Sequence, residues 1–488
     1  MFVAVHFAKE GFVMFVGREK ETAALRSVLD SDKSEFVAVY GRRRIGKTLL
    51  IRETYGYRFA FEHTGMKGAS TKLQLREFGE SLKKYGRRKK KGPSDWFEAF
   101  RMLGELLEAR TEGGKMVVFL DECPWLDTPK SGFASALDHF WNGWATMRKD
   151  VVLIICGSAA SWVASKIDES TGGLHNRLTM HVYLRPFTLG ECDLLAQTRG
   201  IVMNRAQTLE CYMVFGGVPY YWELLRRDQS LAQNIDRMLF SRGGDLHDEF
   251  DHLYTALFRK PEPYLKLIRA LATKKAGLTR DELIATTGLT GNGKLSKMLK
   301  ELEQCDFIRS YSVPGRERNT AIFQLMDNFT LFYFRFLDGA GNVSPDFWTV
   351  SEGSQSVRIW CGLAFERVAL QHIAQIKRKL GIAGVATRTY EWRHTAETDN
   401  ETGAQIDLVI ERSDRVTNLC EMKYTAAPFE ITDEYDAKLR IKRETFISQT
   451  GTRNAVHLTM VSANGIRKNA NSNDIQSVVT LDDLFRDD

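Results

Sequence analysis

Apolar positions follow two different patterns in the first half of the chain. Residues 36–40 (FVAVY), 117–120 (VVFL) and 151–156 (VVLIIC) are short runs of almost only apolar side chains. Such runs are typical of strands that are buried on both faces of a parallel sheet. Between residues 189 and 240, apolar positions instead recur about every 3.6 residues, which indicates helices. The pattern therefore predicts an α/β core that is followed by a helical segment.

Residues 263–325 show a third pattern, which predicts a winged helix-turn-helix. A helix is followed by a short helix, a glycine-containing turn, a third helix and two strands, which the basic loop PGRERN joins. After the first helix, these elements are expected at residues 280–286, 288–291, 292–304, 307–312 and 320–325.

The charges of this segment leave two roles open. Lys294, Lys297 and Lys300 lie at positions i, i+3 and i+6 of the third helix, so its cationic face could contact phosphates. Arg316 and Arg318 lie in the expected wing. Because no set of base-reading side chains accompanies these charges, an intramolecular switch is the alternative to DNA binding.

The C-terminal part predicts a helix, a hairpin and further α/β alternation. The helix, residues 362–381, carries Glu366 close to an apolar stripe. The stripe consists of Leu363, Val368, Leu370, Ile373 and Ile376. Residues 405–424 (QIDLVIERSDRVTNLCEMKY) read as two buried strands that nevertheless contain Asp407, Glu421 and Lys423. A buried carboxylate is costly unless it is paired or holds a metal, so these residues require an explanation.

Composition limits the class of protein. A chain of 488 residues exceeds one hydrophobic core, so we expect two to four domains. The formal net charge of +6 permits a nucleic-acid partner. The seven cysteines are scattered and never spaced as C-x-x-C, which indicates a reducing compartment without disulfides or a zinc site. Without a signal peptide or a membrane-length apolar run, we expect a cytoplasmic protein.

A phosphate-binding loop follows the first apolar run. Gly41-x-x-x-x-Gly46-Lys47-Thr48 lies between an expected strand and an expected helix. Glycines allow backbone N–H groups to surround phosphate oxygens at the helix N-terminus. Lys47 would contact the β- and γ-phosphates, and Thr48 would bind Mg²⁺. The expected ATP-binding residues of this loop are Gly41, Arg42, Arg43, Arg44, Ile45, Gly46, Lys47, Thr48 and Leu49.

Acidic and polar residues follow the next two apolar runs. Asp121 and Glu122 end the second run, at the sheet edge where ligands bind in such folds. Asp121 would belong to the Mg²⁺ shell, and Glu122 would polarise the attacking water. Ser158 ends the third run, where it either senses the γ-phosphate or is a plain turn residue.

The motifs of the first half resemble one family. FVGREKE, YGRRRIGKT, VVFLDE, IICGSAASW, GGLHNRLTMHVYLRPFTLGE and FGGVPYYWELL occur in the order and spacing of the archaeal-type ATPases, which are AAA-related switch ATPases of the STAND class. The resemblance implies that Gly17 and Arg18 lie near the adenine and that GGVPY (216–220) opens a helical lid, with Pro219 against the base. It also implies an arginine sensor or finger, for which Arg177 is the first choice and Arg185 the alternative.

The C-terminal acids resemble a second family. A helical Glu366, a strand Asp407 and then Glu421-x-Lys423 follow the order of PD-(D/E)XK nucleases, although this pattern is loose. Asp407, Glu421 and the Cys420–Glu421 backbone could hold Mg²⁺, and Lys423 could orient or deprotonate a water. The alternative is a structural ion pair between Lys423 and one of the acids in a decayed nuclease fold.

Together these observations predict a multidomain α/β protein. The expected parts are an ATPase core at 14–188, a helical lid at 189–258, a winged helix at 259–340 and a restriction-endonuclease-like domain at 355–488. The expected activity is ATP hydrolysis that switches a Mg²⁺-dependent nuclease acting on DNA rather than RNA. The alternative is a nucleotide-controlled switch whose nuclease-like domain docks a partner, with the winged helix contacting a protein or a second copy. The basic run at 83–91 is either a solvated loop or a nucleic-acid contact.

Overall fold

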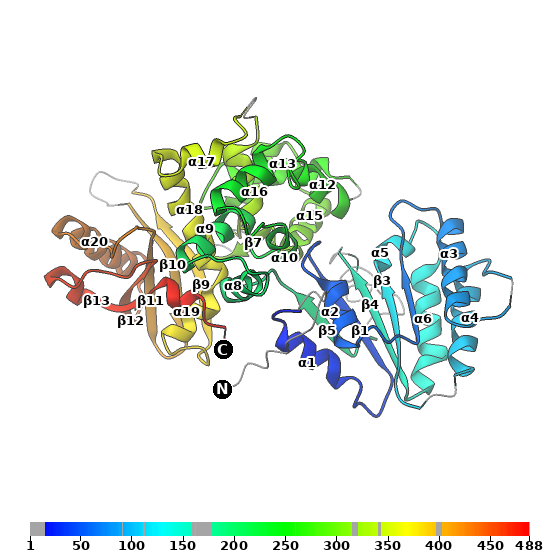
Figure 1. Ribbon diagram of the computed structural model, residues 1–488. Coiled ribbons are helices and arrows are strands. Elements are labelled where there is room, and N and C mark those ends of the chain that lie inside the picture. The colour runs from blue at the N-terminus through cyan, green and yellow to red at the C-terminus, as the bar shows by residue number, and fades with distance from the viewer. Residues whose placement is uncertain are drawn as a thin grey trace. The chain divides into compact units, whose positions relative to one another are not determined.

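The chain forms two compact units that divide after Pro186. The computed structural model describes residues 15–89, 91–110, 113–158, 162, 177–258, 260–314, 321–339, 343–396 and 403–487 (Figure 1). Among the helices in these ranges, none is long and apolar enough to cross a membrane. The two units are described separately below.

A parallel five-stranded sheet forms the centre of the first unit, with the strand order β2-β3-β4-β1-β5. Its strands are β1 (Glu35–Gly41), β2 (Phe61–Thr64), β3 (Met116–Asp121), β4 (Val151–Gly157) and β5 (Met180–Leu184). The three strands expected from the apolar runs are therefore confirmed as β1, β3 and β4. Since β4 lies between β1 and β3, the carboxyl ends of these three strands are neighbours at one edge of the sheet.

Helices cover both faces of this sheet, which explains the uninterrupted apolar runs. The helices are α1 (Glu19–Ser27), α2 (Lys47–Thr54), α3 (Thr71–Lys84), α4 (Trp96–Glu108), α5 (Cys123–Leu126), α6 (Phe133–Gly143) and the short η1 (Ala145–Met147). Phe36 and Ala38 of β1 pack in the core with α3, α4 and α6, whereas Val37 and Val39 pack in the core with α1 and α2 (Figure 1). Successive side chains thus point to opposite buried faces.

The second unit begins with helices. Residues 187–258, all of which the structure describes, contain no strand, as the 3.6-residue period predicted. The helices are α8 (Leu189–Thr198), α9 (Arg205–Phe215), α10 (Pro219–Glu223), α11 (Leu231–Ile235), η3 (Asp236–Phe240) and α12 (Glu249–Leu257). Capping boxes at Thr188, Asn204 and Ser230 fix the starts of α8, α9 and α11.

Residues 260–325 form three helices and a small antiparallel sheet with the order β6-β8-β7. These elements are α13 (Glu262–Ala272), β6 (Leu278–Thr279), α14 (Arg280–Thr287), α15 (Gly293–Gln304), β7 (Ile308–Tyr311) and β8 (Ile322–Leu325). Gly288 ends α14 in the left-handed conformation that helix ends favour. The loop residues Arg316 and Arg318 lie outside the described residues.

The helix expected at 362–381 is two helices, and part of that prediction was wrong. After α16 (Asn328–Phe336) and α17 (Phe347–Ser351), α18 runs from Gln355 to Gln371 and α19 from Ile373 to Lys379. Leu363 is 43% exposed and does not belong to a buried stripe. The helix breaks at His372, whose ring accepts a hydrogen bond from the backbone N–H of Leu189 and contacts the carbonyl of Val368.

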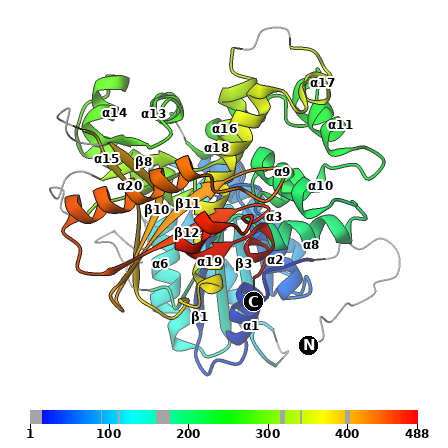
Figure 2. The same ribbon diagram turned by 90° about the vertical axis from the view of Figure 1, so that its left-hand side faces the viewer.

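A second five-stranded sheet completes the unit, with the order β13-β12-β11-β10-β9. Its strands are β9 (Thr387–His394), β10 (Ala404–Arg412), β11 (Val416–Lys423), β12 (Ala455–Ser462) and β13 (Ile475–Val479). Strands β9 to β11 pair antiparallel, which confirms the predicted hairpin, and β11 to β13 pair parallel. The remaining helices are α20 (Asp433–Thr450), η4 (Ala470–Asp474) and α21 (Leu481–Leu484). Helix α20 contacts β9, β10 and β12, and α18 contacts β11 (Figure 2).

Candidate functional site

The loop between β1 and α2 has the backbone of a phosphate-binding loop. Gly41 has a φ of +148°, and a Cβ there would lie 2.2 Å from the carbonyl oxygen of Leu184. Gly46 has a φ of +86° and immediately precedes α2, which has no side-chain cap. Both positions require glycine, and the first-turn N–H groups of α2 are directed to the carboxyl edge of the sheet.

Like Arg42, which is 2% exposed, Lys47 is a buried cation of this loop. Its side chain is only 6% exposed, and its ammonium donates to the carbonyls of Gly41 at 3.1 Å and Arg42 at 2.7 Å. The charge is therefore held inside the curve of the loop. Ile45 packs in the core, so its contribution to a phosphate site would come from its backbone.

Two side-chain hydrogen bonds connect the loop and the neighbouring strand ends. The Thr48 hydroxyl donates to Oδ2 of Asp121 at 2.9 Å, and the Ser158 hydroxyl donates to Oε1 of Glu122 at 2.9 Å. Asp121 is 4% exposed and also accepts the N–H of Glu122 with Oδ1 at 2.9 Å. The structure thus brings together the four residues that the sequence placed after β1, β3 and β4.

Glu122 has an unusual backbone. Its φ of +49° and ψ of +44° lie in the left-handed region, which costs a non-glycine residue about 1 kcal/mol or more. The short helix α5 follows at once, with Pro124 in its first turn. This turn aims the Glu122 side chain at Ser158 at the end of β4.

Arg177 and Arg185 lie at opposite ends of β5. Thr179, next to β5, donates its N–H to Phe36 at the amino end of β1, so Arg177 lies at the amino edge of the sheet. At the other end of the strand, Leu184 pairs with Gly41, and Arg185 follows it beside the loop. Geometry therefore favours the alternative, Arg185, over Arg177 as the arginine near the nucleotide.

The residues expected near the adenine are built into the same edge. Gly17 and Arg18 both have positive φ values, of +69° and +66°. The buried guanidinium of Arg18 donates to the carbonyl of Arg185 at 2.5 Å and lies 3.5 Å from Glu21. The start of α1 is thereby joined to the segment that follows β5.

In the second unit, the GGVPY motif is a tight turn between α9 and α10. A Cβ on Gly217 would lie 1.9 Å from the carbonyl oxygen of Phe187, and the Phe187 N–H donates to the Gly217 carbonyl at 2.6 Å. Pro219 is buried in the first turn of α10. The motif thus holds the first residues of the second unit.

The hairpin of β10 and β11 places its two acids on neighbouring strands. Leu408 pairs with Cys420, and continuing this register by one position sets Asp407 opposite Glu421. Asp407 is 8% exposed and accepts the N–H of Met422 at 3.0 Å, whereas Glu421 is 6% exposed. The two carboxylates are therefore buried and close in the fold.

Lysines surround these carboxylates. Lys442 of α20 donates to Oε2 of Glu421 at 2.5 Å, and Lys423 donates to Oε1 at 3.4 Å. Glu366 of α18 forms an ion pair with Lys275, which lies between α13 and β6. In the described part of the chain Lys423 pairs with Glu421 and forms no ion pair with Asp407, so Glu421 is its partner in the alternative ion pair.

Like charges and burial raise the pKa values of this cluster. Burial and then the charge of Asp407 raise the pKa of Glu366 to about 7, against the effect of Lys275. Burial and Asp407 also raise the pKa of Glu421, against Lys442 and Lys423. The charge of Asp407 thus acts on both Glu366 and Glu421.

The donor chemistry of this cluster fits a hard divalent cation, since Asp407 and Glu421 offer carboxylate oxygens from adjacent strands. Within the described ranges, however, no group of three or more His, Cys, Asp or Glu side chains is arranged around a common point. Two acids with backbone oxygens are therefore the available ligand set, and Glu366 is engaged by Lys275.

Comparison with known proteins identifies the first part of the chain. Residues 15–225 match the family described as an ATPase domain predominantly from Archaea. Residues 15–225 thus resemble an archaeal-type ATPase domain. The match extends beyond Pro186 and includes α8, α9 and α10 of the second unit.

Two proteins of Methanocaldococcus jannaschii are similar in sequence to this chain. The uncharacterized protein MJECL04 is 25% identical over 420 residues, which are 84% of this chain and 88% of that protein. The uncharacterized ATP-binding protein MJ0423 is 44% identical over 43 residues, which are 9% of this chain and 73% of that protein.

Solved structures match the chain with TM-scores below 0.5. The Walker-type ATPase PABY2304 of Pyrococcus abyssi matches with a TM-score of 0.48 and 18% identity, over 66% of this chain and 96% of that one. The ORC2 protein of Aeropyrum pernix matches with a TM-score of 0.39 and 14% identity, over 75% of this chain and 98% of that one.

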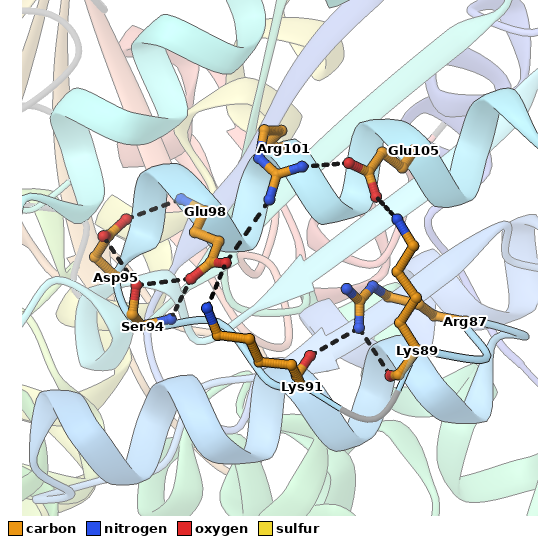
Figure 3. Close-up of polar contacts among 8 residues, drawn as sticks. All are labelled: Arg87, Lys89, Lys91, Ser94, Asp95, Glu98, Arg101 and Glu105. Atoms are coloured by element: carbon orange, nitrogen blue, oxygen red, sulfur yellow. Dashed lines mark hydrogen bonds and ion pairs between the residues drawn. The ribbon is translucent and has the colours of Figure 1, made fainter.

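The basic run at 83–91 of the ATPase domain is largely paired within the domain. Lys89 and Lys91 contact Glu105 at 3.4 Å and Glu98 at 3.9 Å on α4, and the Arg87 guanidinium donates to two carbonyls of the run (Figure 3). Arg101 also contacts both glutamates. These pairs favour the solvated loop over a nucleic-acid contact.

The sequence analysis missed three residues near the carboxylates of Glu366, Asp407 and Glu421. They are Lys275, Lys442 and Tyr435, whose pKa is raised by burial and by the charges of Glu421 and Asp407. Charged residues occur on every side of α20, so periodicity gives no signal for Lys442. Lys275 and Glu366 are 366 − 275 = 91 positions apart in the sequence. No local sequence pattern predicts a contact over that distance.

Proposed function

We propose that the first unit binds and hydrolyses ATP at the loop of residues 41–48 and the adjoining strand ends. The observation that carries this proposal is the pair of hydrogen bonds from Thr48 to Asp121 and from Ser158 to Glu122. In this proposal Thr48 and Asp121 are the metal-binding pair, and Glu122 is the base, which the Ser158 hydroxyl orients. These residues lie at neighbouring strand ends, where ligands bind in parallel sheets.

Each residue then has a role. Lys47 and the loop N–H groups hold the phosphates, and Thr48 and Asp121 hold Mg²⁺, which neutralises charge on the phosphate oxygens. Glu122 accepts a proton from the attacking water, and Ser158 fixes the orientation of its carboxylate. Arg185 is the arginine that contacts the γ-phosphate, with Gly17 and Arg18 on the adenine side.

Replacing Lys47 tests the site. Lys47→Ala should weaken ATP binding by about 100-fold or more, because the loop loses its buried ammonium. Isothermal calorimetry on the full chain measures this, and Lys33→Ala on the same unit is the control of equal charge. An affinity within a few fold of wild type would contradict the assignment.

We further propose that the second unit contains a winged helix at 260–325 and a nuclease-like domain around the β9–β13 sheet. The order of three helices and an antiparallel sheet supports the first assignment. The second is supported by α18, the antiparallel strands β9 to β11, α20 and β12, with Glu366, Asp407, Glu421 and Lys423 on these elements.

In this proposal ATP turnover controls a Mg²⁺-dependent cleavage of DNA. The supporting observation is that Asp407 and Glu421 are both buried on adjacent strands, opposite each other in the register of the hairpin. Asp407 and Glu421 would bind the metal, which activates water and stabilises charge on the scissile phosphate. Lys423 would orient that water, and Lys442 holds the Glu421 carboxylate in place.

Asp407→Asn tests the metal site. The amide keeps an acceptor for the Met422 N–H but removes a ligand charge, so Mn²⁺ affinity and plasmid cleavage should fall about tenfold or more. The free energy of unfolding should change by less than about 1 kcal/mol, since Asp407 accepts a backbone N–H. Asp414→Asn, at the exposed turn of the same hairpin, is the control.

The same variant has a pH signature. A carboxyl group whose pKa rises on folding stabilises the protein at low pH, and that stability is lost as pH increases from about 4.5 through about 7. Without the charge of Asp407, the pKa of Glu366 should be lower, so the unfolding free energy should decline less over this range. A loss of about 3–5 kcal/mol in Glu421→Gln, whose carboxylate pairs with Lys423 and Lys442, with unchanged metal binding would instead show a buried structural ion pair.

A second candidate function is a switch whose nuclease-like domain docks a partner without cleaving. One observation favours it: Glu366 and Glu421 are already paired with lysines. Wild-type protein that hydrolyses ATP but neither binds Mn²⁺ in the second unit nor cuts DNA would support this function.

A further inference from the structure

Lys275 contacts α18 with both its side chain and its backbone. Its ammonium forms an ion pair with Glu366, while its carbonyl oxygen accepts from the guanidinium of Arg367, the next residue of α18. Gln324 of β8 donates to the same carbonyl at 2.8 Å. One residue of the 260–325 segment is thus held by two consecutive residues of the helix that carries Glu366.

A buried polar network surrounds this contact. The Glu391 carboxylate accepts from Arg309 and Gln324, each at 2.6 Å, and lies 3.6 Å from Arg367. All four side chains are largely buried. Such a network is costly to break, because each group would be left without a partner away from water. The position of Lys275 is therefore built into the fold and is not a loose surface pair.

The charge of Lys275 meets a specific need. Glu366 is largely buried on α18, which packs against β11, the strand that carries Glu421, and a buried carboxylate requires a partner. Lys423 and Lys442, which serve Glu421, belong to the hairpin and α20. Lys275 instead comes from the winged-helix segment, so its presence at Glu366 depends on where that segment is docked.

We propose that Lys275 is an internal cation that occupies Glu366 and keeps it from completing the metal site at Asp407 and Glu421. Displacing the turn that carries Lys275 releases Glu366 as a third carboxylate for a divalent ion. The docked winged-helix segment thereby holds the site in a state of low metal affinity. This inference rests on the proposed metal-dependent function of the second unit.

The test compares three lysine variants of the full chain by calorimetry with MnCl₂. Lys275→Met should bind Mn²⁺ about tenfold more tightly, since Glu366 no longer has its lysine. Lys275→Arg, which keeps the charge, should resemble wild type. Lys274→Met is the matched control, because the neighbouring Lys274 pairs with Glu282 at 2.5 Å inside its own segment. It should leave Mn²⁺ affinity unchanged.

Hydrogen exchange on the wild type provides a readout that needs no variant. Mn²⁺ should increase exchange of the backbone amides at 274–278, because the ion competes with Lys275 for Glu366. Unchanged exchange on Mn²⁺ binding, or Mn²⁺ affinity in Lys275→Met that is equal to or weaker than in wild type, would overturn the inference. If Asp407→Asn still abolishes Mn²⁺ binding in that case, the metal site stands without the role of Lys275. If neither wild type nor Lys275→Met binds Mn²⁺, the metal site and this inference are both wrong.

Discussion

Ser158 and Glu122 show how single residues define the ATPase site. The hydroxyl of Ser158 reaches the Glu122 carboxylate from the neighbouring strand, and the left-handed backbone of Glu122 directs the side chain toward it. A base that is fixed in this way loses little freedom when it accepts a proton from water. Ser158 therefore acts through Glu122, as a positioning residue.

Ser158→Ala should reduce ATP turnover about tenfold or more, which is the effect expected from losing a hydrogen bond to a charged group. ATP affinity should stay within about twofold, because Ser158 contacts Glu122 and not the phosphate loop. Steady-state kinetics and calorimetry separate the two effects, and Ser27→Ala, whose hydroxyl bonds only to Ala24, is the control. If ATP turnover in Ser158→Ala is unchanged, Ser158 is a plain turn residue without a role in positioning Glu122.

At this scale the sequence revealed residues whose signal is local. Lys47 and Thr48 follow a glycine pattern, and Asp121 and Glu122 end an apolar run, so spacing alone located them. Arg177 was preferred to Arg185 because it precedes the LRPF motif. Only the direction of β5 in the sheet shows that Arg185, and not Arg177, lies beside the loop. Lys275 and Lys442 had no local signal.

Helix α15 is the element that best suits contact with a nucleic acid. Lys294, Lys297 and Lys300 are exposed on it, while Leu295 and Leu299 bury the opposite side. Lys297 lies 3.9 Å from Glu301, which leaves a mainly cationic exposed face. Such a face would bind phosphates through charge and release counterions.

Replacing these three lysines with glutamine should weaken duplex DNA binding and reduce the slope of log affinity against log salt by about 2 to 3. Fluorescence anisotropy at several salt concentrations measures the slope. Lys438→Gln on α20, whose lysine pairs with Glu434, should change it little. An undetectable or salt-independent interaction in the wild type would favour the docking function.

The elements themselves were predictable to different degrees. The strands β1, β3 and β4 were found because both of their faces are buried, and the β10–β11 hairpin because its turn is polar and its strands are apolar. The break between α18 and α19 was missed. The contact of His372 with Leu189, which is 183 positions away in the sequence, stabilises this break. The helical periodicity of the sequence therefore does not predict the break.

At the scale of the whole molecule, the ATPase domain ends inside the second unit. Phe187 is held by Gly217 and Tyr212, Thr188 contacts Asp487 and Leu189 contacts His372. The first residues after the boundary are thus attached to α9, to α18 and to the C-terminal segment. The sequence could not show this, because Thr188 and Asp487 are 299 positions apart.

The proposed ATP hydrolysis depends on Glu122 as the base, and Glu122→Gln isolates that role. The amide keeps the size of the side chain and an acceptor for Ser158 but cannot take a proton. Measured on the full chain, the variant should bind ATP as tightly as wild type and turn it over about 100-fold or more slowly. Normal turnover in Glu122→Gln, with Lys47→Ala inactive, would contradict the account and move the catalytic base to another residue.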